Sequence, residues 1–414
     1  MSKQDGSKYK SEQKSNYKGS SAPKSGGFSS GRSSNYRPSF SARPKRVQKE
    51  FNPLTFIKKV EEQPASSVFI PKHMFADFLI DEQVKKNIIS RGYKAPTPIQ
   101  DEVIPIILEG KDVIASANTG TGKTAAFLIP LVHNVLAKKT NKVLIITPTR
   151  ELADQIQSEL DLFKRNTRLN SVLCIGGLSI GPQIQQLKRD HSFVIGTPGR
   201  LRDLENNGNI NFNKYDAIVL DEVDTMLDMG FINDIKYIIG LLPDKRHSLF
   251  FSATIPTNLK DVMNNFLRNP VTVSVKTRQS AGNVNQDVIK VGESDKVDLL
   301  HDSLIKPEFT RVIIFLRTKR SADKLSKRLR ERGFDVATIH GDKSQAQRRN
   351  ALTLFKNNKV KILLATDVVA RGIDIDDVSH VINFELPATP EDYIHRIGRT
   401  GRAEKTGNAI TFIA

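Results

Sequence analysis

Residues 113–124 have the sequence VIASANTGTGKT, and a helical pattern of apolar residues follows from Ala125 to Leu136. The order is therefore an apolar strand, a glycine-rich loop and a helix. Glycines let backbone N–H groups approach phosphate oxygens, and the N-terminus of the next helix adds a favourable dipole. In such loops a lysine reaches the β and γ phosphates and the threonine after it ligates Mg²⁺, so we expect these roles for Lys123 and Thr124.

The rest of this loop is expected to bind nucleotide phosphates through its backbone. The strict pattern begins with glycine, whereas this sequence has Ala117 at that position. The alternative is a glycine-rich surface turn with an exposed lysine. The other predicted nucleotide-binding positions are Asn118, Thr119, Gly120, Thr121 and Gly122.

An acidic cluster follows another apolar run, Ala217–Leu220, and contains Asp221, Glu222 and Asp224. In parallel α/β sheets, side chains at the carboxyl ends of strands face the crevice where ligands bind. We predict that Asp221 holds Mg²⁺ and that Glu222 orients and polarises the attacking water, as hydrolysis of a γ-phosphate requires. The alternative is that these acidic residues only begin a solvated helix. The glycine-rich loop upstream in the same domain favours the catalytic role instead.

Short, nearly continuous apolar runs alternate with helical patterns along most of the chain. Such runs indicate strands that are covered on both faces, as in parallel α/β sheets. A polar stretch at 276–285 predicts a linker between a first domain at 51–275 and a second at 286–414. The predicted strands are Val113–Ala115, Val143–Ile146, Ser171–Ile175, Phe193–Ile195, Ala217–Leu220, Ser248–Phe251, Val271–Val275, Val312–Phe315, Val336–Ile339, Ile362–Ala365, Val381–Phe384 and Ala409–Ile413.

Positive charge is concentrated at the N-terminus. The chain has 63 Lys and Arg against 45 Asp and Glu, a net charge of +18, and residues 1–50 contribute twelve of the former and three of the latter. This Ser- and Gly-rich stretch has too few apolar residues to offset its ordering entropy, so we predict a disordered basic tail. Its Tyr and Phe residues can stack on unpaired bases, which predicts RNA affinity; the alternative is a solubilising tail.

The composition excludes several classes of protein. Cys174 is the single cysteine, so an intrachain disulfide scaffold and a Cys/His zinc cluster are both excluded. No apolar run approaches the length needed to span a bilayer, and Met1–Ser20 lacks an apolar secretion signal. We therefore expect a cytoplasmic protein without membrane contact.

A third candidate segment, at 393–402, has the sequence YIHRIGRTGR. Three arginines separated by glycines make a suitable clamp for phosphate. If the two domains close on each other, Arg399 and Arg402 can face the γ-phosphate as arginine fingers.

Together these segments resemble the DEAD-box family of RNA helicases, over about residues 75–414 and with the motifs in the family's order. The resemblance implies two tandem RecA-like domains with mostly parallel sheets. It also implies an ATP-dependent RNA helicase, in which RNA-stimulated ATP hydrolysis with Mg²⁺ is coupled to domain closure and to local duplex unwinding or RNP remodelling. The alternatives are an ATP-gated RNA clamp without unwinding, a DNA-directed motor and, least favoured, a small-molecule kinase, which would not explain the arginines of the second α/β unit.

The resemblance assigns further nucleotide contacts upstream of the loop. In the segment from Gly92 to Gln100, Gln100 is expected to pair with the adenine edge and Lys94 to contact the nucleotide, while Phe75 is expected to stack on the adenine ring. The alternatives are a turn-capping Gln100 and a core Phe75. Coupling between ATP and RNA is assigned to Asp224, Ser252, Thr254 and His395.

The resemblance also implies an RNA path over both domains, built from side chains and N–H groups that contact phosphates without reading bases. The implied partners of the protein are RNA and possible RNP or ribosome-assembly complexes. The protein is expected to act as a monomer. Asp374 is expected to meet the ribose 2′-OH. The predicted RNA contacts are Thr149, Arg150, Gly176, Gly177, Thr197, Gly199, Arg200, Arg317, Gln345, Arg348, Thr366 and Asp374.

Two positions depart from the family pattern. Val223 replaces the alanine of the acidic motif and leaves its carboxylates unchanged. Glu385 stands where the family usually has aspartate, and one additional methylene can shift a carboxylate contact.

Overall fold

The computed structural model describes residues 69–118, 120–254, 266–275, 284–292, 294–367, 375, 378–401 and 406–413. The predicted tail and three predicted site residues, Thr119, Asp374 and Arg402, lie outside these ranges. We call the described residues up to 275 the first lobe and those from 284 the second lobe.

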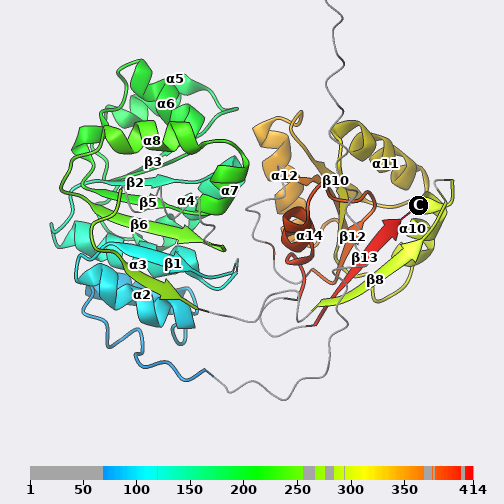
Figure 1. Cartoon of the computed structure of the whole chain (residues 1–414), viewed down its shortest axis with the longest axis horizontal. Coiled ribbons are helices and arrows are strands. Elements are labelled where there is room, and N and C mark those ends of the chain that lie inside the picture. The colour runs from blue at the N-terminus through cyan, green and yellow to red at the C-terminus, as the bar shows by residue number, and fades with distance from the viewer. Residues whose placement is uncertain are drawn as a thin grey trace, which may run out of the picture. The chain divides into compact units, whose positions relative to one another are not determined.

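The first lobe contains a seven-stranded parallel sheet with the order β3-β4-β2-β5-β6-β1-β7 (Figure 1). Its strands match the predicted runs to within one residue at each end. The bounds are β1 Val113–Ser116, β2 Val143–Ile146, β3 Ser171–Cys174, β4 Phe193–Gly196, β5 Ala217–Leu220, β6 His247–Ser252 and β7 Val271–Ser274.

Helices cover both faces of this sheet. Its helices are α1 Glu82–Ser90, α2 Pro98–Leu108, α3 Lys123–Leu136, α4 Arg150–Phe163, α5 Ile180–Leu187, α6 Pro198–Asn206, α7 Val223–Asp228 and α8 Ile232–Gly240. In Figure 1, α5, α6 and α8 lie on one face, and α2 and α3 on the other. Along β2, Ile145 packs in the core beneath α2 and α3, whereas Leu144 and Ile146 pack in the core beneath α6 and α8. This double burial explains why the strand sequences are continuously apolar.

The second lobe repeats the plan with a six-stranded parallel sheet of order β10-β11-β9-β12-β13-β8. Ile313 and Phe315 of β9 pack toward α12 and α14, and its other side chains pack toward α10 and α11. Two parallel α/β sheets confirm the predicted fold class. The bounds are β8 Val284–Lys290, β9 Val312–Leu316, β10 Val336–Ile339, β11 Ile362–Thr366, β12 His380–Asn383, β13 Gly407–Ile413, α10 Lys296–Leu304, α11 Lys319–Glu331, α12 Gln345–Lys356 and α14 Pro390–Ile397.

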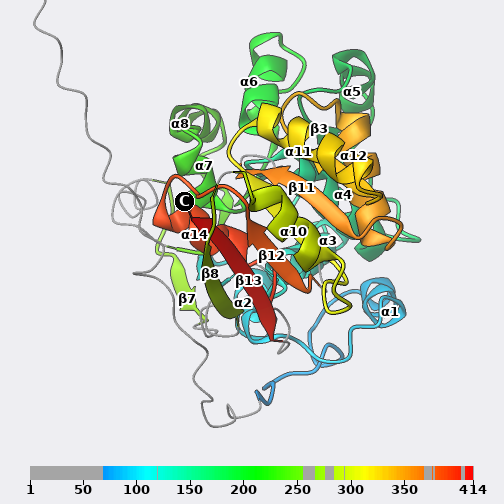
Figure 2. The same cartoon turned by 90° about the vertical axis from the view of Figure 1, so that its right-hand side faces the viewer.

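The predicted linker is too long at its C-terminal end, because β8 begins at Val284 and pairs with β13 from Gly407 onward (Figure 2). Val284 and Gln286 are buried while Asn285 and Asp287 are exposed. A strand at the sheet edge that alternates in this way lacks the continuous apolar run by which the other strands were predicted. In the part of the chain that the structure describes, no helix has the length and apolar character needed to cross a bilayer.

Candidate nucleotide and RNA sites

The glycine-rich loop joins β1 to α3 as predicted. Gly122 precedes α3 in a left-handed conformation, with φ of 91°, and a Cβ at this position would clash with the side-chain amide of Gln100. Both the backbone angle and the available space therefore require glycine. Lys123 is buried in the loop, and its Nζ donates a hydrogen bond of 2.7 Å to the carbonyl oxygen of Ala117.

The acidic cluster lies at the carboxyl end of β5, two strands away from β1 in the same sheet. Asp221 and Glu222 are both buried. Glu222 has φ of 54° and is the residue preceding α7, and its backbone N–H donates to Asp221 Oδ1 at 3.0 Å. The sharp turn keeps both carboxylates at the sheet edge instead of carrying the second one along the helix.

Burial raises the pKa of both carboxyl groups. The pKa of Asp221 is raised to about 6, with the nearby Lys123 acting in the opposite direction. The pKa of Glu222 is raised to about 7 by burial first and by the charge of Asp221 second. A carboxylate with a pKa near neutrality can accept a proton from water at physiological pH, which is the requirement for a general base.

These residues line a common cavity with the loop. Its first-lobe lining includes Thr97, Gln100, Gly120, Gly122, Lys123, Thr124, Asp221 and Glu222. The structure thus brings together the predicted phosphate, metal and water-activating residues. Thr97, at this cavity, precedes α2 within the predicted adenine-reading segment from Gly92 to Gln100, although no contact of its own was predicted for it.

Gln100 connects the upstream segment to the loop. Its side chain is fully buried; Oε1 accepts from the N–H of Thr97 at 3.0 Å, and Nε2 donates to the carbonyl oxygen of Gly122 at 3.1 Å. Phe75 is in the core, where its ring meets that of Tyr93 edge-on at 5.9 Å, and Lys94 is exposed. Neither Phe75 nor Lys94 lines the cavity, so the stacking role of Phe75 and the nucleotide contact of Lys94 stay predictions.

The predicted coupling residues of the first lobe are in contact. Asp224 Oδ2 accepts from the N–H of Ala253 at 3.1 Å, and from both the N–H and the hydroxyl of Thr254 at 3.0 and 3.2 Å. The hydroxyl of Ser252 donates to the carbonyl oxygen of Thr254 at 2.5 Å. Since the N–H of Ala117 also donates to the carbonyl oxygen of Ser252 at 3.1 Å, this segment touches the acidic cluster and the glycine-rich loop.

Val223, the departure within the acidic motif, is buried in the core beneath α6 and α8. Its branched side chain therefore points away from the carboxylates.

The predicted RNA contacts of the first lobe gather around the end of β3. The guanidinium of Arg150 lies against the backbone of Gly176 and Gly177, where a Cβ at Gly177 would clash with Arg150 Nη1. Arg200 donates from Nη1 and Nη2 to the carbonyl oxygen of Leu178, both at 3.3 Å. Two arginines and two glycines from α4, α6 and the β3 end thus form one surface.

The remaining predicted contacts of the first lobe stand at helix starts. Thr149 caps α4 by accepting from the N–H of Leu152 at 3.3 Å. Thr197 precedes α6, and Gly199 lies in its first turn.

In the second lobe, Arg317 and Thr366 stand at the carboxyl ends of the neighbouring strands β9 and β11. Gln345 begins α12, and Arg348 lies one turn later, with its Nη1 3.4 Å from Gln345 Oε1. Glu385 Oε2 accepts from the N–H of Arg317 at 2.7 Å. Glu385, which stands where the family usually has aspartate, therefore holds the backbone of Arg317, a predicted RNA contact.

The arginine-rich segment follows α14. The Nε of Arg399 donates to the carbonyl oxygen of His395 at 3.2 Å, which links the predicted finger to the predicted coupling histidine. Arg396 was predicted as one of the three arginines of the phosphate clamp, but in the structure it is buried, pairs with Asp367 at 2.5 Å and donates to the carbonyl oxygen of Glu385 at 2.7 Å. It holds the chain after β11 and the chain after β12 together.

Comparison with known proteins matches this arrangement. The DEAD/DEAH box helicase model matches residues 97–262, and the helicase conserved C-terminal domain model matches residues 295–404. An ATP-dependent RNA helicase CshA of Listeria monocytogenes is 44% identical over 82% of this chain and 66% of its own length. The DEAD-box ATP-dependent RNA helicase CshA of Bacillus subtilis is 45% identical over 82% of this chain and 69% of its own length. The chain thus spans about two thirds of the length of these relatives.

Solved structures of RNA-bound proteins are also similar to this chain. Dbp5 of S. cerevisiae bound to RNA and ADP BeF3 matches with a TM-score of 0.72 and 29% identity, over 82% of this chain and 89% of that one. Mss116p bound to ssRNA and AMP-PNP matches with a TM-score of 0.73 and 29% identity, over 83% of this chain and 76% of that one. On its motifs, its two parallel sheets and these similarities, the chain belongs to the DEAD-box family of ATP-dependent RNA helicases.

Proposed function

We propose that this protein hydrolyses ATP at the cavity between the glycine-rich loop and the acidic cluster, and uses the cycle to separate short RNA duplexes or remodel RNPs. The observation that carries the proposal is the pair of buried carboxylates, Asp221 and Glu222, in the same cavity as Lys123 and Thr124. Glu222 accepts the proton of the attacking water, and Lys123 stabilises charge on the phosphates.

The oxygen donors at this cavity fit Mg²⁺, which prefers hydroxyl, carboxylate and phosphate oxygens. Within the described ranges, no group of three His, Cys, Asp or Glu side chains could hold a metal by itself. Such a sparse set is typical of Mg²⁺ held by one or two protein groups plus nucleotide phosphates. Thr124 and Asp221 would hold the ion, which would neutralise developing charge on the β and γ phosphates.

RNA binding is coupled to ATP hydrolysis through the segment at 252–254. Asp224 binds this segment from the acidic side, and the surface formed by Arg150, Gly176, Gly177 and Arg200 supplies backbone contacts in the same lobe. These contacts are to phosphates and carry no base code, so binding is expected to be independent of sequence. We include in the proposal that the protein acts as a cytoplasmic monomer on RNP or ribosome-assembly complexes.

A strand-displacement assay tests this function. A short RNA duplex with a single-stranded overhang should be separated by the protein with ATP and Mg²⁺, and not with ATP and a chelator. Lys123→Ala should lower both displacement and ATP turnover by about 100-fold or more, because charge stabilisation in a dry site is worth several kcal/mol.

The matched control is Lys139→Ala, at an exposed lysine of the same lobe, which should leave both rates unchanged. RNA-stimulated turnover that persists in Lys123→Ala would contradict the assigned site. Turnover without any strand displacement by the unmodified protein would contradict the helicase activity.

A further inference from the structure

Helix α11 of the second lobe carries an unusual excess of positive charge. Its 13 residues include six Lys or Arg and two Asp or Glu. Its buried face consists of Ala322, Leu325, Ser326 and Leu329. All of its exposed positions carry charged side chains. The helix is therefore fixed to the lobe by one apolar face and presents charge on the rest of its surface.

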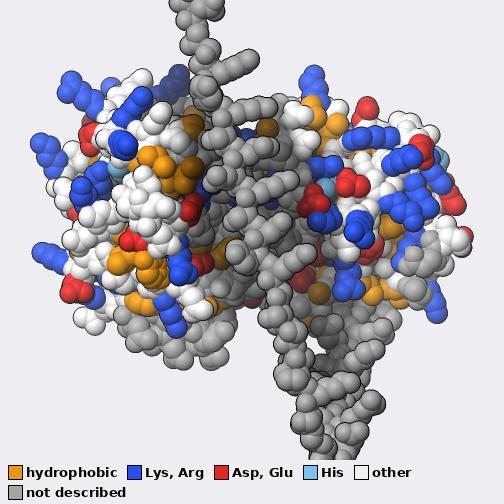
Figure 3. Space-filling model, turned by 90° about the horizontal axis from the view of Figure 1, so that it is seen from above, with side chains coloured by type: hydrophobic (Ala, Val, Ile, Leu, Met, Phe, Trp, Pro, Cys, Tyr) orange, Lys and Arg blue, Asp and Glu red, His pale blue; other side chains and the backbone are white. Residues whose placement is uncertain are grey.

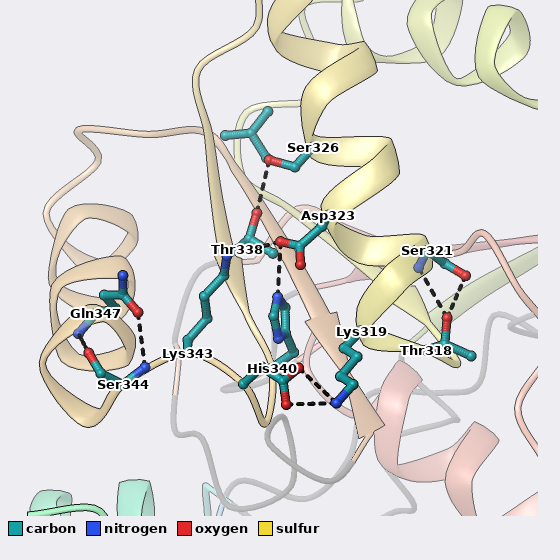
Figure 4. Close-up of polar contacts among 12 residues, drawn as sticks. Thr318, Lys319, Ser321, Asp323, Ser326, Thr338, His340, Lys343, Ser344 and Gln347 are labelled. Carbon is teal, nitrogen blue, oxygen red and sulfur yellow. Dashed lines mark hydrogen bonds and ion pairs between the residues drawn. The ribbon is translucent and has the colours of Figure 1, made fainter.

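The carboxylates on and beside α11 already have partners. Asp323 Oδ1 accepts from Lys343 Nζ at 2.9 Å and lies 3.1 Å from His340 Nε2, in the contact shown in Figure 4. The pKa of Asp323 is lowered: its partial burial raises the pKa, but the hydrogen bonds from Lys343 and His340 outweigh that effect. Glu331 lies 3.9 Å from Lys327 on the helix itself.

Beyond the helix, Asp342 pairs with Lys319 at 2.7 Å and Asp298 pairs with Arg332 at 2.5 Å. Each of these two carboxylates is thus paired with a cation other than Arg320, Lys324 or Arg328.

Arg320, Lys324 and Arg328, which we call the basic stripe, have no such partner. All three side chains are exposed, and within the described part of the chain none of these side chains makes a hydrogen bond or an ion pair. Their four-residue spacing places them on one side of the helix, about 6 Å apart and about 12 Å from first to last. Lys and Arg side chains are prominent on the second-lobe surface in Figure 3.

Such an arrangement costs stability unless an anion is bound. Like charges four residues apart on a helix repel each other, whereas solvated helix faces gain from alternating opposite charges. The exposed face of α11 also lacks the apolar side chains that form the core of a protein–protein interface. A polyanion with regularly spaced charges is the class of ligand that fits.

We propose that the basic stripe binds the phosphate backbone of RNA beyond the segment held by the predicted RNA path. The inference rests on the proposed path at Arg317, because the stripe begins three residues later and runs away from that contact along α11. A nucleic-acid strand carries one charge about every 3.4 Å along its axis, so a stripe of about 12 Å follows three or four phosphates. The stripe lengthens the binding site without reading bases.

The test compares poly(U) strands of increasing length. In the full-length protein, replacing the stripe by R320Q, K324Q and R328Q together should leave the affinity for the shortest bound strands unchanged. For strands long enough to pass α11, the slope of log affinity against log salt should fall by about two units, since about 0.7 unit is lost for each phosphate contact. Melting temperature and RNA-free ATP turnover serve as folding controls.

Two comparison variants make the outcome specific. K86Q, K139Q and K245Q together remove the same charge from exposed positions of the first lobe and should not change the slope. R320K with R328K keeps the charges and should retain the slope of the unmodified protein, because phosphate contacts need charge more than fork geometry.

The inference is overturned if the stripe variant keeps the original slope at every length, or if both triple variants lose it equally. R317Q separates this result from the predicted path, because it should weaken binding at all lengths, including the shortest. If R317Q has no effect while the stripe variant does, the path is wrong and the stripe remains an RNA contact.

Discussion

At the scale of single residues, the cavity at the glycine-rich loop contains carboxylates whose burial opposes their ionisation. Glu222 is the stronger case, because burial and the charge of Asp221 raise its pKa from 4.5 to about 7. The folded protein therefore holds this proton more tightly than the unfolded chain does. Its contribution to the unfolding free energy falls as the pH rises from 4.5 through 7, and the full cost applies above that range.

Glu222→Gln should remove this cost. In the nucleotide-free protein we expect the substitution to raise the unfolding free energy by roughly 3 kcal/mol at pH 8 and to change it little at pH 4, while it abolishes ATP turnover. Urea unfolding at the two pH values measures the difference. Glu102→Gln, at an exposed position, controls for the loss of one carboxyl group. An equal stability change at both pH values would show that the ionisation of Glu222 is not opposed by the fold.

The contrast between Gln100 and Phe75 shows how far motif spacing predicts a residue's position. Gln100 reaches the glycine-rich loop through the carbonyl of Gly122, and the loop requires glycine at that position. Phe75 instead lies in a cluster of aromatic rings with Phe78 and Tyr93. A linear pattern gives the order of residues, but the direction of a ring depends on neighbours that are distant in sequence.

At the scale of elements, the buried carboxylate of Asp112 connects the N-terminal end of β1 to two other segments of the first lobe. Asp112 accepts from the N–H of Ser248 on β6 and from the N–H of Arg268 before β7, both at 2.8 Å. Its own carbonyl oxygen accepts from the N–H of Val271 at 2.8 Å. These contacts fix the start of the strand that ends in the glycine-rich loop.

Asp112→Ala should lower the unfolding free energy by roughly 3 kcal/mol, because two N–H groups would lose a charged acceptor. Asp112→Asn should cost less, since one amide oxygen remains. Denaturant unfolding of the full chain provides the measurement, with Asp287→Ala at an exposed position of β8 as the control. Loss of stability no larger than that of the control would mean that Asp112 does not hold the strands together.

The elements also show why sequence reasoning located most strands and missed β8. β2, β5 and β9 are buried on both faces, and their uniform apolar runs were sufficient to place them. β8 lies at the edge of its sheet with Asn285 and Asp287 exposed, and its polar start was taken for linker. Edge position is a property of the assembled sheet, so no local run of residues reports it.

In the candidate site, too, the features within one short segment were predicted, and those that depend on distant contacts were not. The loop and the acidic cluster were predicted because each lies within one short segment. The roles of Arg396 and Glu385 were not, because they depend on contacts to Asp367 and Arg317 from other strands. Both side chains support the backbone at strand ends where the predicted RNA contacts stand.

At the scale of the whole molecule, each lobe carries half of the proposed chemistry. The first lobe has the loop, the carboxylates and the segment at 252–254 in mutual contact, whereas the second has the arginine segment after α14. The family to which the chain belongs is named for ATP-dependent action on RNA, and our proposal is that RNA promotes the joining of these halves around ATP. Efficient hydrolysis should therefore require an arginine from the second lobe as well as the carboxylates of the first.

RNA-stimulated ATP turnover of Arg399→Ala, compared with the unmodified full-length protein, tests this central claim most directly. Arginine fingers contribute about 10³ to 10⁵ in rate, so turnover should fall by at least about 1,000-fold while binding of a fluorescent ATP analogue without RNA and the melting temperature change little. Turnover at the original RNA-stimulated rate in this variant would contradict the account.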